Sequence, residues 1–381
     1  MIYLDHAATT PILPEVLDAM LPWFQPERVG NPGSIHTQGV KAHNAIEKAR
    51  KQVAQMIGAD PSEIFFTSGG TESNNAWLKC IESRWCAYAP TFITTKIEHS
   101  SVLEPVSKNR IEYVKVHCDG SVDLEDLEQL LQKYRGRVGA VSVMWVNNEL
   151  GTINPIKEIG TICKKYRVPF HTDAVQAAGH VVIDVHDCGV DFLSLSGHKF
   201  GAPLGIGVLY ISNAVRKHPL IIGGGQEREM RGGTENVPGI VGIGRAAEIV
   251  AANLTVHNQL WEYLRTVFLA TLDADMHEEF TINGDTKNKS SNIISMTVPG
   301  VNSESLLLLL DQQEVYVSAG SACSASSSEP SHVLRGIGMS EEDAACTVRI
   351  SMGFEQNYPE MVRAAHAIAN AVHKVKSMYS Q

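Results

Sequence analysis

Residues Val168-Pro-Phe-His-Thr-Asp-Ala-Val-Gln176 form a short apolar run that ends in a cluster of polar side chains. A run of this length and composition predicts a buried strand, here expected over 168–172. Similar runs lie on either side of it and alternate with amphipathic helical stretches such as 124–134 and 156–166. This alternation predicts an α/β domain with a mostly parallel central sheet. The other expected strands are 64–67, 91–95, 111–116, 139–146, 192–196 and 207–211.

The regions outside this block indicate further helices and a second, smaller unit. Residues 39–58 and a long Ala- and Leu-rich region from Pro238 to about 272 are expected to be helical. A shorter succession of strand-like and helix-like segments follows and predicts a smaller C-terminal α/β domain. Its expected elements are strands at 292–298 and 315–318, a helix around 303–312 and a final helix from Pro359.

The composition is that of a soluble globular protein. The chain has 381 residues, 44% of them hydrophobic and 19% charged, and a formal net charge of −10. Proteins that bind mainly through the nucleic-acid backbone are normally basic, so we expect no direct nucleic-acid binding. No run approaches the roughly 18 apolar residues of a membrane span, and the first residues lack a secretory pattern, which favours a cytoplasmic protein. The seven cysteines include no C-x-x-C pair, so we expect neither a disulfide framework nor a metal site.

The segment Phe66-Thr-Ser-Gly-Gly-Thr-Glu72 joins an expected strand to an expected helix through two glycines. Backbone N–H groups at a helix N-terminus favour an anion, and glycine lets a ligand approach the backbone closely. Gly70 and Thr71 are therefore candidates for binding a phosphate group. The same residues are also typical of a plain strand-to-helix turn with Thr71 as the cap, and they match neither a Walker loop nor a dinucleotide fingerprint.

A second motif lies at the end of the strand expected over 168–172, where alternation places His171 and Asp173 on the same side. In an open α/β sheet the ligand crevice lies beyond the carboxyl ends of the strands. A carboxylate there can hold a protonated ring nitrogen of a cofactor. Two other interpretations stay open for this motif: a helix-capping aspartate and a His-x-Asp metal pair.

A third motif, Ser194-Leu-Ser-Gly-His-Lys199, places a lysine at the end of another expected strand. Such a lysine can form a Schiff base with an aldehyde cofactor, although most lysines are solvated surface groups. Three strand ends thus supply an anion site, a carboxylate for a ring nitrogen and an amine. Pyridoxal 5′-phosphate (PLP) requires these three groups, so the sequence predicts a PLP site at this edge of the sheet.

Ten short motifs follow one another along essentially the whole chain. They are Tyr3-Leu-Asp-His-Ala-Ala-Thr-Thr-Pro11, Gly30-Asn-Pro32 with His36, Thr67-Ser-Gly-Gly-Thr-Glu-Ser73, Glu98-His99, Val146-Asn-Asn-Glu-Leu-Gly151, His171-Thr-Asp-Ala-Val-Gln176, Ser196-Gly-His-Lys199, Gly223-Gly-Gly-Gln-Glu227, Gly232-Gly-Thr234 and Ser318-Ala-Gly-Ser-Ala-Cys323. In residues and order they resemble the cysteine desulfurases of the class V aminotransferase family, PLP enzymes of fold type I. The resemblance implies a large PLP-binding domain over 15–256 and a small domain formed by 1–14 and 257–381.

The resemblance also implies roles for individual residues. Lys199 would form the Schiff base, Asp173 would pair with the pyridine nitrogen, and His99 would stack on the ring and shuttle protons. Arg349, together with Asn148, would bind the substrate carboxylate, which a planar guanidinium grips through two hydrogen bonds. The implied cofactor-binding residues are Gly70, Thr71, Asn148, Asp173, Gln176, Ser196, His198, Lys199 and Thr234, the last supplied by the neighbouring subunit of a homodimer.

Cys323 lies in a Ser- and Ala-rich segment, about 318–331, that we expect to be a mobile loop. The resemblance makes it the catalytic nucleophile, whose thiolate attacks the sulfur of PLP-bound L-cysteine. The products would be L-alanine and a persulfide that passes to an acceptor protein. A group that visits a buried cofactor and then an outside partner is well served by such a loop. Iron–sulfur scaffold, tRNA thiolation and DNA phosphorothioation pathways all use such enzymes, and the sequence does not choose among their acceptors.

Other functions fit parts of this pattern. A selenocysteine or cysteine-sulfinate lyase, or a plain aminotransferase, would share the fold and the cofactor, although a transaminase has no use for a loop thiol. A non-catalytic scaffold for sulfur-acceptor proteins would be expected to lack Lys199 or Cys323, and both are present. Leu204 and Gln226 depart from the residues that relatives often carry, which leaves details on the phosphate side open.

Overall fold

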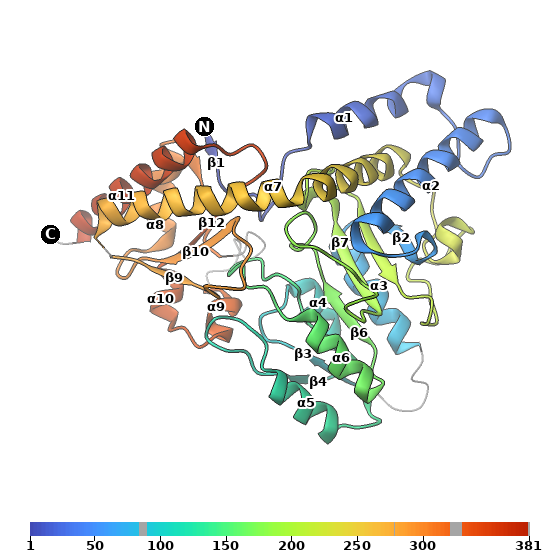
Figure 1. Ribbon diagram of the computed structural model, residues 1–381, viewed down its shortest axis with the longest axis horizontal. Helices are drawn as coiled ribbons and strands as arrows, with labels where there is room; N and C mark the ends of the chain where they lie inside the picture. The colour runs from blue at the N-terminus through green and yellow to red at the C-terminus, as the bar shows by residue number, and fades with distance from the viewer. Residues whose placement is uncertain (84–89, 278, 321–329, 380–381) are drawn as a thin grey trace.

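The structure, a computed structural model, describes residues 1–83, 90–277, 279–320 and 330–379. Within these ranges, one sheet of seven strands and one of three each lie in a separate part of the molecule (Figure 1). A two-stranded pair accompanies the smaller sheet. The molecule therefore has a larger and a smaller part, each with its own sheet.

The large sheet has seven strands, and most of its neighbouring pairs are parallel. The strands are β2 (Ile64–Thr67), β3 (Thr91–Thr94), β4 (Arg110–Tyr113), β5 (Val138–Ser142), β6 (Phe170–Asp173), β7 (Phe192–Ser196) and β8 (Gly207–Ile211), in the spatial order β2-β8-β7-β6-β5-β3-β4. Only β8 runs antiparallel to its neighbours, β2 and β7. The α/β fold with a mostly parallel sheet is thus confirmed. Parallel neighbours need long crossovers, which the intervening helices provide.

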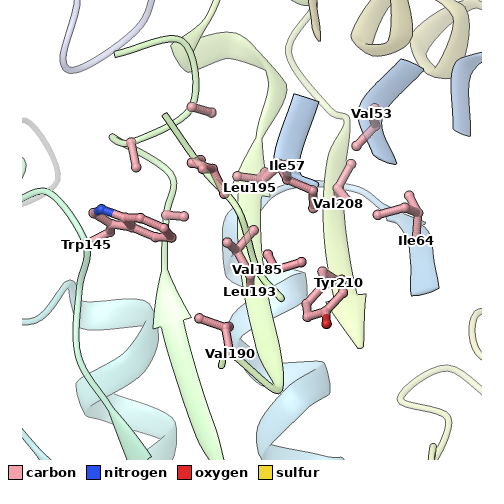
Figure 2. Close-up of a cluster of buried hydrophobic side chains, with 14 of the residues drawn as sticks. Val53, Ile57, Ile64, Trp145, Val185, Val190, Leu193, Leu195, Val208 and Tyr210 are labelled. Atoms are coloured by element: carbon pink, nitrogen blue, oxygen red, sulfur yellow. The ribbon is translucent and has the colours of Figure 1, made fainter. Parts of the chain in front are cut away.

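Helices cover both faces of this sheet (Figure 1). Strand β8 shows why, since Val208 and Tyr210 belong to one apolar cluster while Leu209 and Ile211 belong to another on the opposite face. Figure 2 shows part of the first cluster, in which Val53 and Ile57 lie over the strands. The covering helices are α2 (Thr37–Ile57), α5 (Leu124–Lys133) and α6 (Ile156–Tyr166) on that face, and α3 (Gly70–Glu82) and α4 (Ser100–Val106) on the other.

The smaller part is built around an antiparallel sheet, with the N-terminal strand paired to a distant segment. The chain's first strand, β1 (Ile2–Tyr3), pairs in parallel with β11 (Val315–Tyr316). The other elements are β9 (Thr281–Asn283), β10 (Ile293–Thr297) and β12 (Thr347–Ser351), in the order β12-β10-β9, with α8 (Ser303–Asp311), α9 (His332–Gly336), α10 (Glu341–Ala345) and α11 (Tyr358–Tyr379). Strand β12 contains Arg349, so one of the predicted site residues lies on the small sheet.

The long helix α7 (Val237–Met276) belongs to both parts (Figure 1). Its residues from Val237 to Val250 contribute to the core of the large sheet, and those from Trp261 to Met276 to the core of the small one. By length and composition alone α7 could cross a membrane, although polar residues interrupt its apolar sequence. It packs against α2, α11 and α1 (Pro14–Met20), as a core helix does. The domain boundary expected at 256/257 falls inside α7 and stays a prediction.

Five short 3-10 helices complete the described elements. They are η1 (Leu21–Phe24), η2 (Pro26–Arg28), η3 (Pro61–Glu63), η4 (Gly197–Lys199) and η5 (Gln226–Glu229). Helix η4 matters most, because it follows β7 directly and carries His198 and Lys199 at the carboxyl end of the sheet.

Candidate active site

The carboxyl ends of β6 and β7 face a cavity of about 210 Å³. This is the edge of an open α/β sheet at which ligands bind. The start of α3, the N-terminus of α4, the segment after β1 and strand β12 close the cavity from other sides. Ten residues predicted from the sequence line it: Gly70, Thr71, His99, Asn148, Asp173, Gln176, Ser196, His198, Lys199 and Arg349.

Asp173 ends β6 and turns its carboxylate into the cavity wall. Its Oδ1 accepts a hydrogen bond from the Val175 backbone N–H at 3.0 Å, and its Oδ2 accepts one from Asn74 Nδ2 at 2.8 Å. The residue is buried, so these two donors replace the water that a carboxylate loses on burial. The arrangement holds an oriented carboxylate at the cavity.

Lys199 reaches across the cavity to the segment that follows β1. Its Nζ donates to the carbonyl oxygens of Ala7 at 2.7 Å and Ala8 at 2.6 Å. Gln176 Nε2 donates to the same Ala7 oxygen at 2.8 Å. The N-terminal segment therefore orients both the amine and the amide.

The N-terminus of α3 forms a site suited to an anion. A Cβ on Gly70 would lie 2.9 Å from Val175 Cγ2, so a larger residue would displace the wall of the cavity. Ser196 and His198 lie on the same side of the cavity, where β7 ends. Burial, with a smaller contribution from Lys199, lowers the pKa of His198 to about 4, so this imidazole is neutral near pH 7. Its Nδ1 lies 3.2 Å from Thr9 Oγ1.

Arg349 enters the cavity from the small sheet and is held from two directions. Its Nη2 donates to Asp5 Oδ1 at 2.7 Å, and its Nη1 donates to the Asn148 carbonyl oxygen at 3.0 Å. Two buried polar atoms here, Arg349 Nε and Asn148 Oδ1, have no partner among the described residues. Buried polar atoms without partners are costly. One donor and one acceptor thus remain for a ligand.

Two buried glutamates lie behind the wall that His99 forms. Burial raises the pKa of Glu98 to about 8, and its Oε1 accepts hydrogen bonds from the Met144 N–H and from Thr95 Oγ1. Burial also raises the pKa of Glu149. Ser331 Oγ donates to Glu149 Oε2 at 2.5 Å. Glu149 thereby ties the cavity wall to the C-terminal side of the predicted loop.

Two predicted site residues are not among those that line the cavity. Thr234 lines a separate, smaller hollow together with Ser68, Gly205 and Arg231. Its expected role, across a subunit boundary, stays a prediction. Cys323 lies outside the described residues. Ser318, five positions earlier, exchanges both backbone hydrogen bonds with Arg349, which lines the cavity.

The metal interpretation of His171 and Asp173 finds no support. His171 is fully buried and stacks on Trp77 with ring centroids 4.3 Å apart. Its Nδ1 contacts Ser142 Oγ at 2.8 Å and its Nε2 contacts Ser194 Oγ at 3.1 Å, so both nitrogens are engaged. Across residues 1–83, 90–277, 279–320 and 330–379 there is no cluster of three or more His, Cys, Asp or Glu side chains suited to a metal.

Sequence reasoning missed several residues of this site. Asn74 and Ser101 line the cavity and connect Asp173 to His99, while Asp5 holds Arg349. A signal for Asn74 exists in the sequence, because it lies one helical turn after Gly70 and so on the same face of α3. Nothing in the sequence marks Ser101 beyond its position two residues after the Glu98-His99 motif, or Asp5 beyond its place in the Tyr3–Pro11 motif.

The chain is similar to known proteins over nearly its whole length. Residues 2–363 match the family described as aminotransferase class-V. The cysteine desulfurase IscS of Dictyoglomus turgidum is 42% identical over 382 residues, which cover 99% of this chain and 96% of the relative. A solved NifS-like protein superposes with a TM-score of 0.91 at 36% identity, covering 98% of this chain and 99% of its own. A structure described as SspA in complex with cysteine matches with a TM-score of 0.80 at 36% identity, covering 92% and 99%. The chain therefore belongs to the class V aminotransferase family and, within it, to the cysteine desulfurases.

Proposed function

We propose that this protein is an L-cysteine desulfurase that uses PLP, converts L-cysteine to L-alanine and carries the sulfur as a persulfide on Cys323. The main support is that the Asp173 carboxylate, the Lys199 amine and the N-terminus of α3 meet at one cavity. PLP is the cofactor of class V aminotransferases, and the relatives that match over nearly the full length are cysteine desulfurases.

The residues around the cavity fit PLP. Gly70 leaves the backbone N–H groups of α3 open to a phosphate, and Asp173 offers a buried, oriented carboxylate to a protonated ring nitrogen. Asn148 Oδ1, buried and without a partner among the described residues, can accept a hydrogen bond from the bound group. When bound, PLP supplies the electron sink that lets bonds near the amino group of an amino acid break.

Lys199 and Arg349 orient the reactants. The Ala7 and Ala8 carbonyl oxygens hold the Lys199 amine at the cavity, where it can bond to the aldehyde carbon of the cofactor and later move a proton. Arg349 is fixed by Asp5 and by the Asn148 backbone, and its unpartnered Nε can donate to the carboxylate of L-cysteine.

Sulfur transfer balances without an outside oxidant. The Cys323 thiolate attacks the substrate sulfur, a sulfur–sulfur bond forms, and the carbon–sulfur bond of the substrate breaks. The electron pair of that bond stays with the carbon, which takes up a proton to become the methyl group of L-alanine. The five positions from Ser318 to Cys323 can span at most roughly 17 Å. Because Ser318 is paired with Arg349, that length supports a reach into the cavity.

We also propose two protein partners. A second copy of the chain would bring its Thr234 to the phosphate, which would make the site complete only in a homodimer. An acceptor protein would take the persulfide from Cys323. Sedimentation of the active protein at assay concentration tests the first of these, and a fully active monomer would contradict it.

The test of the activity is a sulfur balance. The protein is incubated with L-cysteine, without added thiol, and L-alanine, protein-bound sulfane sulfur and keto acid are measured together. A desulfurase forms L-alanine and bound sulfane sulfur in equal amounts during the first turnover. A plain aminotransferase would form keto acid instead, and a non-catalytic scaffold would form neither product.

A further inference from the structure

Two side chains, Asn74 and Ser101, connect His99 in the wall of the cavity to the Asp173 carboxylate. Asn74 Nδ2 donates to Asp173 Oδ2 and to Ser101 Oγ, at 2.8 Å in each case. Ser101 Oγ in turn lies 2.7 Å from His99 Nδ1. Asn74 and Ser101 are both buried. The mechanism described so far assigns a role to Asp173 and His99 but none to the two residues between them.

The direction of these hydrogen bonds follows from the chemistry of the groups. The amide nitrogen of Asn74 only donates, so Ser101 Oγ accepts from it and keeps its own hydrogen for His99 Nδ1. The backbone N–H of Ser101, which can only donate, also points at Nδ1, at 3.1 Å. This second bond is the N-cap of α4, for which His99 is the capping residue. Nδ1 of His99 therefore accepts two hydrogen bonds.

We infer that Asn74 and Ser101 are positioning residues that hold neutral His99 with its proton on Nε2. A hydrogen on Nδ1 would point at the backbone N–H of Ser101, which can only donate, and would take away the acceptor of the Ser101 hydroxyl hydrogen. With Nδ1 unprotonated, Nε2 is the nitrogen that carries the proton and can exchange it. The Asn74 NH₂ group donates both of its hydrogen bonds within this network. Asn74 Oδ1 is buried and has no hydrogen-bond partner among the described residues. Asn74 therefore orients Asp173 and Ser101 at the free-energy cost of one buried oxygen without a hydrogen bond.

Other charged and titratable groups surround His99, and the substitutions below leave them in place. On its own segment Glu98 precedes it, and His332 of α9 contacts the Glu98 carbonyl oxygen. Glu149 is close enough for the charge of His99 to influence its pKa. The groups that line the same cavity are Asp173, His198, Lys199 and Arg349. A catalytic role for His99 Nε2 rests on the proposed function, but the position of the proton on His99 does not.

The test uses the full-length protein as purified, labelled with ¹⁵N-histidine. Long-range proton–nitrogen NMR spectra report which ring nitrogen carries the proton. The His99 signals are those that disappear in His99→Gln. Wild-type His99 is expected to show an unprotonated Nδ1 and a protonated Nε2. In Ser101→Ala and in Asn74→Leu one bond into Nδ1 is lost or loosened, so the titration midpoint of His99 moves upward by about half a pH unit to one unit. Ser101→Thr restores the hydroxyl and the wild-type midpoint.

Ser107→Ala is the matched control. Ser107 follows the same helix α4, is exposed, and donates to the Glu104 carbonyl oxygen, so its loss should leave the His99 signals unchanged. A wild-type proton on Nδ1, or an unchanged midpoint in folded Ser101→Ala and Asn74→Leu, would overturn the inference. If Asn74→Leu does not fold, the Ser101→Ala and Ser101→Thr pair decides. An inactive protein with the expected His99 signals would contradict the proposed function and support this inference.

Discussion

The floor and the rim of the cavity are built in different ways. The floor consists of Gly70, Asp173, Ser196 and Lys199, which end or closely follow strands β2, β6 and β7 of the large sheet. Every residue of those strands is buried, so backbone pairing and packing on both faces fix where their ends point. The fold itself therefore fixes the backbone positions of the floor residues.

The rim depends on side-chain bonds between distant segments. It consists of Asn148, Glu149 and Arg349, together with Ser318 and Ser331 on either side of the predicted loop. The Arg349–Asp5 ion pair and the Ser331–Glu149 hydrogen bond hold these segments together. Under the proposed function, the floor would hold the cofactor in place, and the rim would bind the substrate and take part in the transfer of sulfur.

The largest expected effect comes from removing the floor amine. In Lys199→Ala we expect turnover to fall by about 10³-fold or more, because Lys199 is the only amine among the described residues that line the cavity. L-alanine formation and the visible absorbance of the purified protein measure the effect. Lys164→Ala, at an exposed lysine of α6, is the control. Full turnover in Lys199→Ala would contradict the role of Lys199 as the amine that bonds to the cofactor.

On the rim side, Cys323→Ser should stop sulfur transfer and spare binding. PLP and L-cysteine bind through floor and rim groups that this change leaves in place, while a hydroxyl is a far poorer nucleophile toward sulfur than a thiolate. Mass spectrometry of the wild type with L-cysteine should find the added sulfur on the peptide that contains Cys323. Sulfur on Cys118 or Cys346 instead, or undiminished L-alanine in Cys323→Ser without added thiol, would contradict the persulfide role.

A smaller loss is expected when the floor carboxylate is removed. In Asp173→Ala the ring nitrogen loses its partner, and we expect turnover to fall by about 10²- to 10³-fold while the fold persists. An asparagine is a poor control here, because its NH₂ group would face either the Val175 N–H or the Asn74 NH₂. Circular dichroism and cofactor content separate loss of function from loss of fold. Wild-type turnover would mean that another group fills this role.

The floor was far easier to predict from the sequence than the rim. Strands 64–67, 192–196 and 207–211 were predicted at the bounds that the structure has, because their mainly apolar, β-rich sequences reflect burial on both faces. Strand 139–146 was predicted too long. Beyond Ser142 the neighbouring β3 has already ended, and the chain continues as buried irregular backbone. Lys199 and Asp173 could be placed because they follow predicted strands.

The rim and the polar connections of the wall leave weaker signals. The pairing of Ile2–Tyr3 with Val315–Tyr316 joins two-residue strands more than 300 positions apart, too short to show any periodicity. Asn74 and Ser101 are polar residues on helices, a pattern that normally indicates a solvated face. Only the packing of α3 and α4 against the sheet turns these side chains inward.

The smallest effect on activity, but a clear one on stability, is expected from Glu98→Gln behind the His99 wall. Both hydrogen bonds to the Glu98 side chain reach the same oxygen, Oε1, so the carbonyl oxygen of glutamine can accept them. Burial raises the pKa of Glu98 from 4.5 to about 8. Between these pH values the folded protein holds a proton that the unfolded chain has lost. The wild-type free energy of unfolding therefore falls as the pH rises through this window, in total by a few kcal/mol.

Glutamine cannot ionise, so the free energy of unfolding of Glu98→Gln should not show this fall. The free energy of unfolding of Glu98→Gln relative to that of the wild type should therefore rise from pH 5 to pH 8. Urea unfolding of the full-length protein at both pH values measures it. The exposed Glu104→Gln on α4 is the control and should follow the wild type, since its side chain is already in water. Parallel pH dependence of Glu98→Gln and wild type would mean that Glu98 is ionised in the folded protein. The wall behind His99 would then hold a buried charge, and would resemble the ion-paired rim more than the floor.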